Sequence, residues 1–372
     1  TAATYNANGS VLAAATGFAT GNAALANGVT IGGAITSTGG NIIINGRGFN
    51  GASANIGVEQ LAGNAISTTG AGTIRISGIA QGTASNANLN VGVALRNIVT
   101  TQNGVLQING QGGNSTGLQN IGILFSSAGG IARSTGTGAI TISGTGGTGT
   151  GGRNYGVLVN NTSGISPTGS GAVLVFGQGG TGGGTNSGVV VNDAGFGSII
   201  GGGGAITING FGGNTANSNN QGVALVGTGA GIGVLSNSGA GSITVNGTGA
   251  LSAATGAVIR SVERRAGTQA ISVTGTGGGG TTGSNYGVII GSTSGITATG
   301  GGAISITGQG GNAGANAVGV IVGSTGSIVA GTSAITVNGT GGLSNGSSSH
   351  GVQFNGGGAG TGALTSTTGA VN

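Results

Sequence analysis

Few side chains in this 372-residue chain could act as acids, bases or metal ligands. The carboxylates are Glu59, Asp193 and Glu263, and His350 is the only histidine. Hydrolysis of a glycosidic bond needs two carboxyl groups about 5 to 9.5 Å apart. The repeat described below places the three acids in different coils, and it places none of them in or next to the coil of His350. We therefore expect neither a carboxylate pair nor a Ser-His-acid triad, and no enzyme activity.

Metal and cofactor sites are also not expected. The chain has no Cys, which excludes disulfides and thiolate ligands. Solenoid repeats that bind Ca²⁺ carry G-G-x-G-x-D, and this chain has the glycines without the Asp that would supply the carboxylate. We predict that the protein holds no metal and no cofactor. His350 is expected to fill the corner position that Tyr155 and Tyr286 hold in other repeats.

The positive charge is weak and scattered. Eight Arg and no Lys give a net charge of +5 over the whole chain. A nucleic-acid footprint needs clustered Lys and Arg, so no nucleic-acid partner is expected. One local cluster, Arg260, Arg264 and Arg265, can be interpreted as a docking patch for an anionic partner or as a solvated, distorted repeat.

Two sequence phrases recur along the chain and predict the elements that position these residues. The first, G-A-I-T-I-x-G-x-G-G, alternates apolar and polar residues as a short strand does. From Ile42 to its last, frayed copy at Leu364, ten steps give (364 − 42)/10, roughly 32 residues per repeat. The first apolar residues of the complete copies form a predicted core column: Ile42, Ile74, Leu106, Ile140, Val173, Ile206, Ile243, Ile271, Ile304 and Ile335.

The second phrase, N-x-G-V-x-V, lies between successive copies of the first and predicts a second strand. A weaker third signal, which includes Ile98, Ile131 and Ile232, predicts a short third strand. Stacked Asn side chains can hydrogen-bond from coil to coil. The Asn of the second phrase is therefore predicted to form a corner ladder: Asn55, Asn90, Asn120, Asn154, Asn186, Asn220 and Asn285.

Three short strands per repeat cannot bury themselves, so the repeats must stack as coils of a β-solenoid. We predict an all-β parallel β-helix of about 10 to 11 coils over residues 39–372, with an incomplete last coil. Residues 1–38 are expected to form an irregular N-terminal segment, as a cap or a first coil. The 96 glycines are expected at corners with positive φ, and Asn-Gly pairs such as Asn109-Gly110 are expected to form turns after the first strand.

The phrases GAITISGTGG, NYGVLV and SGISPTGSG resemble the Gly/Thr/Asn-rich repeats of bacterial filamentous-haemagglutinin-like and autotransporter adhesins. That resemblance covers about residues 39–366 and implies a right-handed β-helix that serves as a secreted stalk at the bacterial cell surface. The roughly 32-residue coil is longer than is usual in that family.

We therefore expect an extracellular structural rod, either a stretch of a longer stalk or a subunit that associates end to end or laterally. The binding target, a glycan or another cell-surface molecule, is open. No apolar run is long enough to span a membrane. The alternative is an ice-binding solenoid, because the outward column of the first strand carries Thr141, Thr207, Thr244 and Thr336. A β-helix that binds or cleaves polysaccharide is a third, less favoured interpretation.

Overall fold

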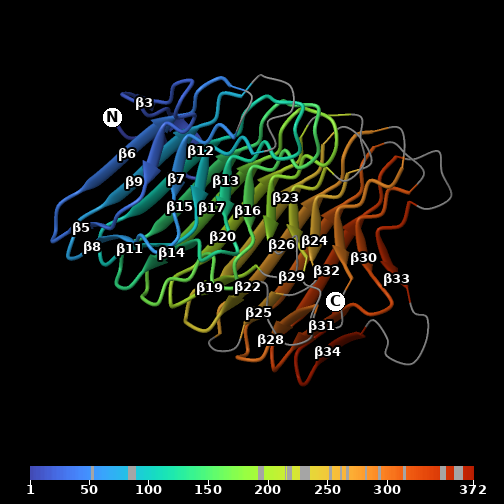
Figure 1. Ribbon diagram of the computed structural model, residues 1–372. Helices are drawn as coiled ribbons and strands as arrows, with labels where there is room; N and C mark the ends of the chain where they lie inside the picture. Colours follow the sequence, from blue (N-terminus) through green and yellow to red (C-terminus); the bar gives the residue numbers. More distant parts are fainter. Residues whose placement is uncertain are drawn as a thin grey trace.

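The protein is a β-solenoid whose coils stack in chain order from one end to the other (Figure 1). The structure is a computed structural model, and every regular element in its described residues is a β-strand. None of these residues belongs to a helix that could cross a membrane. The described residues are 1–51, 54–82, 89–191, 197–213, 215, 220–226, 235–250, 254–259, 262–264, 268–280, 283–291, 295–312, 316–343, 349–355 and 363–372.

The first phrase of each repeat forms the first sheet, an 11-stranded parallel sheet. Each of its full strands has six residues, and in strands such as β6, β12 and β17 their burial alternates, as expected for one face in the core and one face outside. In spatial order the strands are β3 (Ala19–Thr20), β6 (Ile42–Arg47), β9 (Ile74–Ile79), β12 (Leu106–Gln111), β15 (Ile140–Thr145), β17 (Val173–Gln178), β20 (Ile206–Phe211), β23 (Ile243–Thr248), β26 (Ile271–Thr276), β29 (Ile304–Gln309) and β32 (Ile335–Thr340).

The second phrase forms the second sheet, which is also parallel and has 11 strands of three residues each. In chain order they are β4 (Val29–Ile31), β7 (Val58–Gln60), β10 (Val93–Leu95), β13 (Ile123–Phe125), β16 (Val157–Val159), β18 (Val189–Val191), β21 (Val223–Leu225), β24 (Ala257–Ile259), β27 (Val288–Ile290), β30 (Val320–Val322) and β33 (Val352–Phe354).

The third side of the solenoid is divided into sheets of four and six strands. Isolated bridges at Ile165 join the two parts, and Pro167, which has no N–H to donate, follows within the same segment. The strands are β5 (Ile35–Ser37), β8 (Ile66–Thr68), β11 (Ile98–Thr101), β14 (Ile131–Ser134), β19 (Ile199–Gly201), β22 (Leu235–Asn237), β25 (Val262–Arg264), β28 (Ile296–Ala298), β31 (Ser327–Ala330) and β34 (Ala363–Ser366).

The sequence-based assignment of this third side was wrong at Ile98 and Ile131. The prediction that Leu364 begins a frayed copy of the first strand was also wrong, because Leu364 lies on β34 of this third side and pairs with Ile328. Ile66 pairs with Val99, not with Ile98, and Val99 in turn pairs with Ala132, not with Ile131. Because successive side chains alternate between faces, a one-residue error exchanges the inner and outer residues. In the next part of the column Leu235 of β22 pairs with Ile199, whereas the predicted Ile232 lies outside the described residues.

The inward residues form one continuous hydrophobic core from Ile31 to Ile335. All ten residues of the predicted first-strand column belong to it, and each is at most 8% exposed. Repeats of unequal length keep this register: β20 to β23 spans 243 − 206 = 37 residues and β23 to β26 spans 271 − 243 = 28, yet both pairs align all six residues. Differences in repeat length are therefore absorbed by the connections between strands.

Glycine is needed mainly where two backbones approach each other, not at turns. A Cβ on Gly110 would lie 2.1 Å from the carbonyl oxygen of Gly122, and a Cβ on Gly122 would lie 2.5 Å from the backbone of the next coil. Neither residue has positive φ, and Asn109-Gly110 lies inside β12. The predicted Asn-Gly turn after the first strand was therefore wrong, because this pair continues the strand while its glycine admits the facing backbone.

The two ends of the chain complete the solenoid differently. At the N-terminal end, β3, β4 and β5 pair in parallel with β6, β7 and β8, so residues 19–37 form a first coil. At the other end, Val371 bridges to Ile335 beyond β34, and residues 370–372 begin another strand on β32. Residues 1–16 do not belong to any coil. They contain an antiparallel hairpin of β1 (Thr4–Tyr5) and β2 (Val11–Ala13).

Candidate functional site

The Asn corner ladder is a chain of side-chain hydrogen bonds that runs parallel to the solenoid axis. Its amide Nδ2 atoms donate to the Oδ1 atom of the next coil over five steps, at distances of 3.1, 3.3, 2.9, 2.8 and 3.2 Å from Asn55 to Asn220. Asn154 also donates to the carbonyl oxygen of Gly149, at 3.0 Å. These side chains are fully buried and cannot reach water. Each bond between coils therefore satisfies an amide group that would otherwise lack a partner.

The ladder is interrupted in the C-terminal coils. Ala254 occupies the position after Asn220 and Ala317 occupies the position after Asn285, and both are fully buried. Asn285 still accepts a hydrogen bond from the backbone N–H of Ala254, at 3.0 Å. The ladder is therefore continuous from Asn55 to Asn220 and broken beyond it.

The hairpin region, residues 1–16, lies across the outer face of the first sheet; we call it the N-terminal strap. At its base, Asn45 Nδ2 on β6 donates to the carbonyl oxygens of Thr1 and Thr16, at 3.1 and 2.9 Å. At its tip, Asn209 Nδ2 on β20 donates to the carbonyl oxygen of Asn8, at 2.7 Å. β6 and β20 are five strand spacings apart, about 24 Å. The eight residues from Thr1 to Asn8 reach about 26 Å when extended, so this part of the strap runs along the solenoid axis.

The tip of the strap packs on the apolar side chains of β17. Gly9 has φ of 90°, and a Cβ there would lie 3.0 Å from Leu174 Cγ and 3.1 Å from Phe176 Cβ. Phe176 also packs against Phe211, with ring centroids 5.5 Å apart. A glycine is therefore required at the tip both for its backbone conformation and for its close approach to this apolar anchor.

The strap divides the outer face of the first sheet into a covered part and a bare part. Under it, the outward side chains of Ser77 and Ser143 are each only 2% exposed, whereas the equivalent Thr274 and Thr307 are exposed. Burial raises the pKa of the Tyr5 hydroxyl on β1, and the charge of Arg75 on β9 partly opposes that rise. The Thr column is interrupted at Leu174, between Thr141 and Thr207, where the strap tip packs. Beyond the strap the column continues as Thr244, Ser272, Ser305 and Thr336 on β23–β32.

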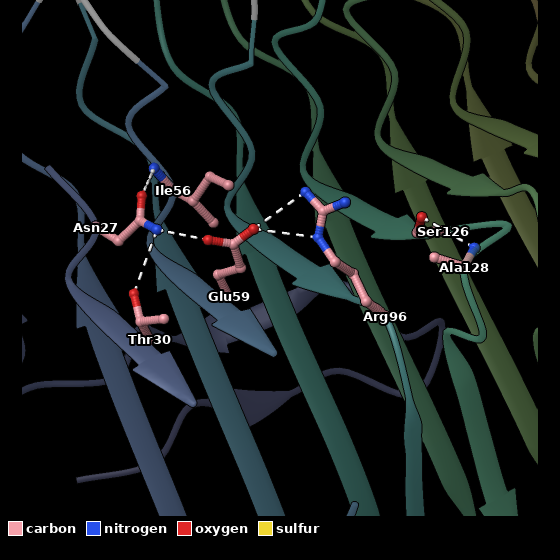
Figure 2. A network of polar contacts seen from close by, with 7 residues as sticks. All are labelled: Asn27, Thr30, Ile56, Glu59, Arg96, Ser126 and Ala128. Carbon is pink, nitrogen blue, oxygen red and sulfur yellow. Dashed lines mark hydrogen bonds and ion pairs between the residues drawn. The ribbon is translucent and has the colours of Figure 1, made fainter. Parts of the chain in front are cut away.

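Glu59, the acid whose side chain the structure describes, belongs to a structural network on the second sheet (Figure 2). Its Oε1 atom accepts a hydrogen bond from Arg96 Nε at 3.1 Å and forms an ion pair with Arg96 Nη2 at 3.0 Å. Its Oε2 atom accepts from Asn27 Nδ2 at 2.6 Å, and Asn27 Oδ1 accepts from the N–H of Ile56 at 3.2 Å. The Glu59 carboxylate on β7 therefore links the coil of β4, through Asn27, to the coil of β10, through Arg96.

For most of the other candidate residues the structure does not describe the side chains. Arg260, Arg265 and Asp193 lie outside the described residues, and Arg264 and Glu263 lie on β25, where only the backbone is described. The predicted docking patch therefore stays a prediction. His350 is exposed and precedes β33, as Tyr155 precedes β16 and Tyr286 precedes β27. The described residues contain no group of three or more His, Cys, Asp or Glu that could hold a metal ion.

A polar groove that the sequence did not reveal lies at the carboxyl ends of β6, β9 and β12. It has a volume of about 370 Å³, and its lining includes the side chains of Arg47, Gln81, Gln111 and Asn114. Arg47 and Gln111 flank Ile79 in the sheet register, so three successive strands contribute to it. The Arg47 guanidinium lies over the Phe18 ring, with Cζ 5.1 Å from the centroid. We call this site the Arg47 groove.

Comparisons of the chain with protein-family models, with curated proteins and with solved structures found no match.

Proposed function

We propose that this chain is a non-enzymatic structural rod of a bacterial extracellular surface protein. The observation that carries the proposal is the single core that runs without interruption from Ile31 to Ile335, reinforced by the buried Asn ladder. Eleven stacked strands extend about 50 Å along the axis. A rod of this kind resists bending, because each interior coil is hydrogen-bonded to both neighbours through the first and second sheets.

The outer surface supports an extracellular stalk. Only 11 of 372 side chains carry a formal charge, and solubility depends on outward Thr, Ser and Asn. The proposed extracellular location rests on the resemblance of the repeats to those of bacterial adhesins. Antibodies against the purified chain should label intact cells of the source bacterium as strongly as permeabilised cells. Labelling that appears only after permeabilisation would contradict an extracellular role.

End-to-end association of rods belongs to the same proposal. At the C-terminal end, Phe354 is 49% exposed and Val352 and Leu364 are half-buried, so apolar residues of the last coil reach the surface. At the other end Val29 and Ile35 are also half-buried. Open strand edges and exposed apolar residues favour pairing with another copy.

Sedimentation velocity over a range of concentrations tests this association. The wild-type chain is expected to form species larger than the monomer as its concentration rises, and Phe354→Glu should shift them toward monomer. Leu118→Glu is the matched control, because Leu118 is 61% exposed but lies away from the ends. A wild-type chain that stays monomeric at all concentrations would leave the longer stalk as the remaining form of the proposal.

Ice binding is the second candidate, and the bare part of the first sheet is the observation that favours it. Thr244, Ser272, Ser305 and Thr336 lie in register on adjacent strands, spaced by about 4.8 Å. Thermal hysteresis of the purified chain tests this candidate. A freezing point that equals the melting point would exclude it, and hysteresis that disappears in Ser305→Lys would support it.

A further inference from the structure

We propose that the Arg47 groove binds a carboxylate-bearing sugar unit of an acidic saccharide. This site goes beyond the structural role, because a rod needs no polar groove. The groove has a volume of about 370 Å³, within the range of small-ligand sites.

The first argument is the unsatisfied charge of Arg47. Among the described residues the ion pair is that of Arg96 with Glu59, and no carboxylate pairs with Arg47. The Nε atom of Arg47 is buried and has no hydrogen-bond partner. Packing over the Phe18 ring holds the guanidinium by one face, which leaves its in-plane N–H groups as the donors for an anion.

The second argument concerns the kind of anion. A guanidinium matches a planar carboxylate through two parallel N–H···O bonds. The lining includes no second cation, which a doubly charged phosphate group would favour. A monoanionic carboxylate therefore fits the charge of the groove best.

The third argument concerns the rest of the ligand. Besides Arg47, the polar lining consists of side-chain amides, among them those of Gln81, Gln111 and Asn114. Each amide offers both a donor and an acceptor, as each sugar hydroxyl does. Asn114 Oδ1 already accepts from the N–H of Thr148 at 3.1 Å, which fixes the orientation of that amide. Ile79 and Ala80 supply a small apolar surface for the C–H face of a sugar ring.

The sheet register shows why the charge of this groove lies at the N-terminal end of the solenoid. Arg47, Ile79 and Gln111 belong to one outward column of the first sheet, whose later members include Gln178 and Gln309. In the described part of that column Arg47 supplies the one cation. The other coils therefore lack the charge at this position.

Saturation-transfer NMR with methyl glucuronide and methyl glucoside tests the proposal, because these probes differ only in the carboxylate. We expect the glucuronide to bind the full chain about tenfold more tightly than the glucoside, as a charge-assisted bond implies. Arg47→Gln should remove this preference, and Gln111→Ala should weaken glucuronide binding while the preference remains. Gln309→Ala, the control in the same column, should change neither.

Three results would overturn the proposal. The first is no detectable transfer to the glucuronide from the wild-type chain. The second is equal binding of the two sugars, and the third is full glucuronide binding by Arg47→Gln. Acetate serves as a further probe: if it competes as well as the glucuronide does, the groove recognises a carboxylate without a sugar. Unchanged thermal melting of Arg47→Gln shows that the variant is folded, and none of these results bears on the rod itself.

Discussion

The coils from β6 to β20 and those from β23 to β32 have the same core but different outer surfaces. Both groups have Ile, Val or Leu at the same two inward positions of the first sheet, as Ile142 and Ile306 illustrate, and all but Val337 near the end are buried. The N-terminal group carries the strap and a continuous Asn ladder, whereas the C-terminal group is bare and its ladder is broken at Ala254 and Ala317. The inward residues thus define the coil, and the outward residues define what lies on it.

The residues that anchor the strap tip show the same difference between the two groups of coils. On β17 the outward positions hold Leu174 and Phe176, whereas on β26 and β29 the equivalent positions hold Ser and Thr. The apolar pair receives the tip at Gly9 and does not contribute to the core.

The core comparison gives the largest expected effect. Ile142→Ala under the strap and Ile306→Ala in the bare part each remove a fully buried side chain. Each should lower the free energy of unfolding by about 2–5 kcal/mol, and the two losses should be similar. Guanidinium denaturation of both variants measures them. A large loss in one and almost none in the other would show that the halves do not have a common core.

The ladder gives the next largest effect. Asn154→Ala removes a buried amide that donates to Asn186 and accepts from Asn120. The partners lose their bonds where water cannot replace them, so we expect a loss of about 1–3 kcal/mol in the free energy of unfolding. Asn338→Ala is the control, because Asn338 is exposed on β32, and it should change stability by less than about 0.5 kcal/mol. Equal losses in the two variants would contradict the role of the ladder.

The strap anchor can be exchanged for the residue type of the bare coils. Leu174→Thr removes apolar contact with the strap tip and should favour opening of the strap by about 1–2 kcal/mol. Exchange of the hydrogen-bonded amides of Gly9 and Thr16 should then become roughly 5–30 times faster. Ser272→Thr in the bare part is the matched control. Unchanged exchange in Leu174→Thr would mean that the apolar pair does not hold the strap.

Alkaline pH should loosen the strap with the smallest effect. Because burial raises the pKa of Tyr5 in the folded state, the folded chain keeps a proton that the unfolded chain loses above about pH 10. Stability from this group is therefore fully present below pH 10 and decreases as the pH rises beyond it. Melting temperatures at pH 8 and above pH 10 should fall more for the wild type than for Tyr5→Phe. Parallel curves would show that Tyr5 is not buried in solution.

Much of the fold could be predicted from the sequence, because each coil repeats the same local pattern. Period-two alternation identified the inward residues of the first sheet, and the recurring Asn before the second strand identified the members of the ladder. The third side was assigned with one-residue errors at Ile98 and Ile131, because its short strands offer too few residues to fix the register. The glycines could not be explained either, since contacts such as Gly110 to Gly122 depend on how two sides of a coil approach each other.

The strap and the groove could not be predicted, because neither has a local pattern. Asn209 bonds to Asn8 across 201 residues, a contact that no pattern within one repeat indicates. The Arg47 groove depends on three successive coils that end in register, which no single repeat reveals. The second sheet also buries outward residues such as Ala94 and Leu158, which the sequence analysis did not identify.

Electron cryomicroscopy of the purified chain tests the central claim most directly. We predict a rod about 50 Å long for each copy, with extra density across one face over the half that contains β9 to β20 and a bare face beyond it. A rounded particle without stacked strands, or a rod whose first-sheet face is bare along its whole length, would contradict the account.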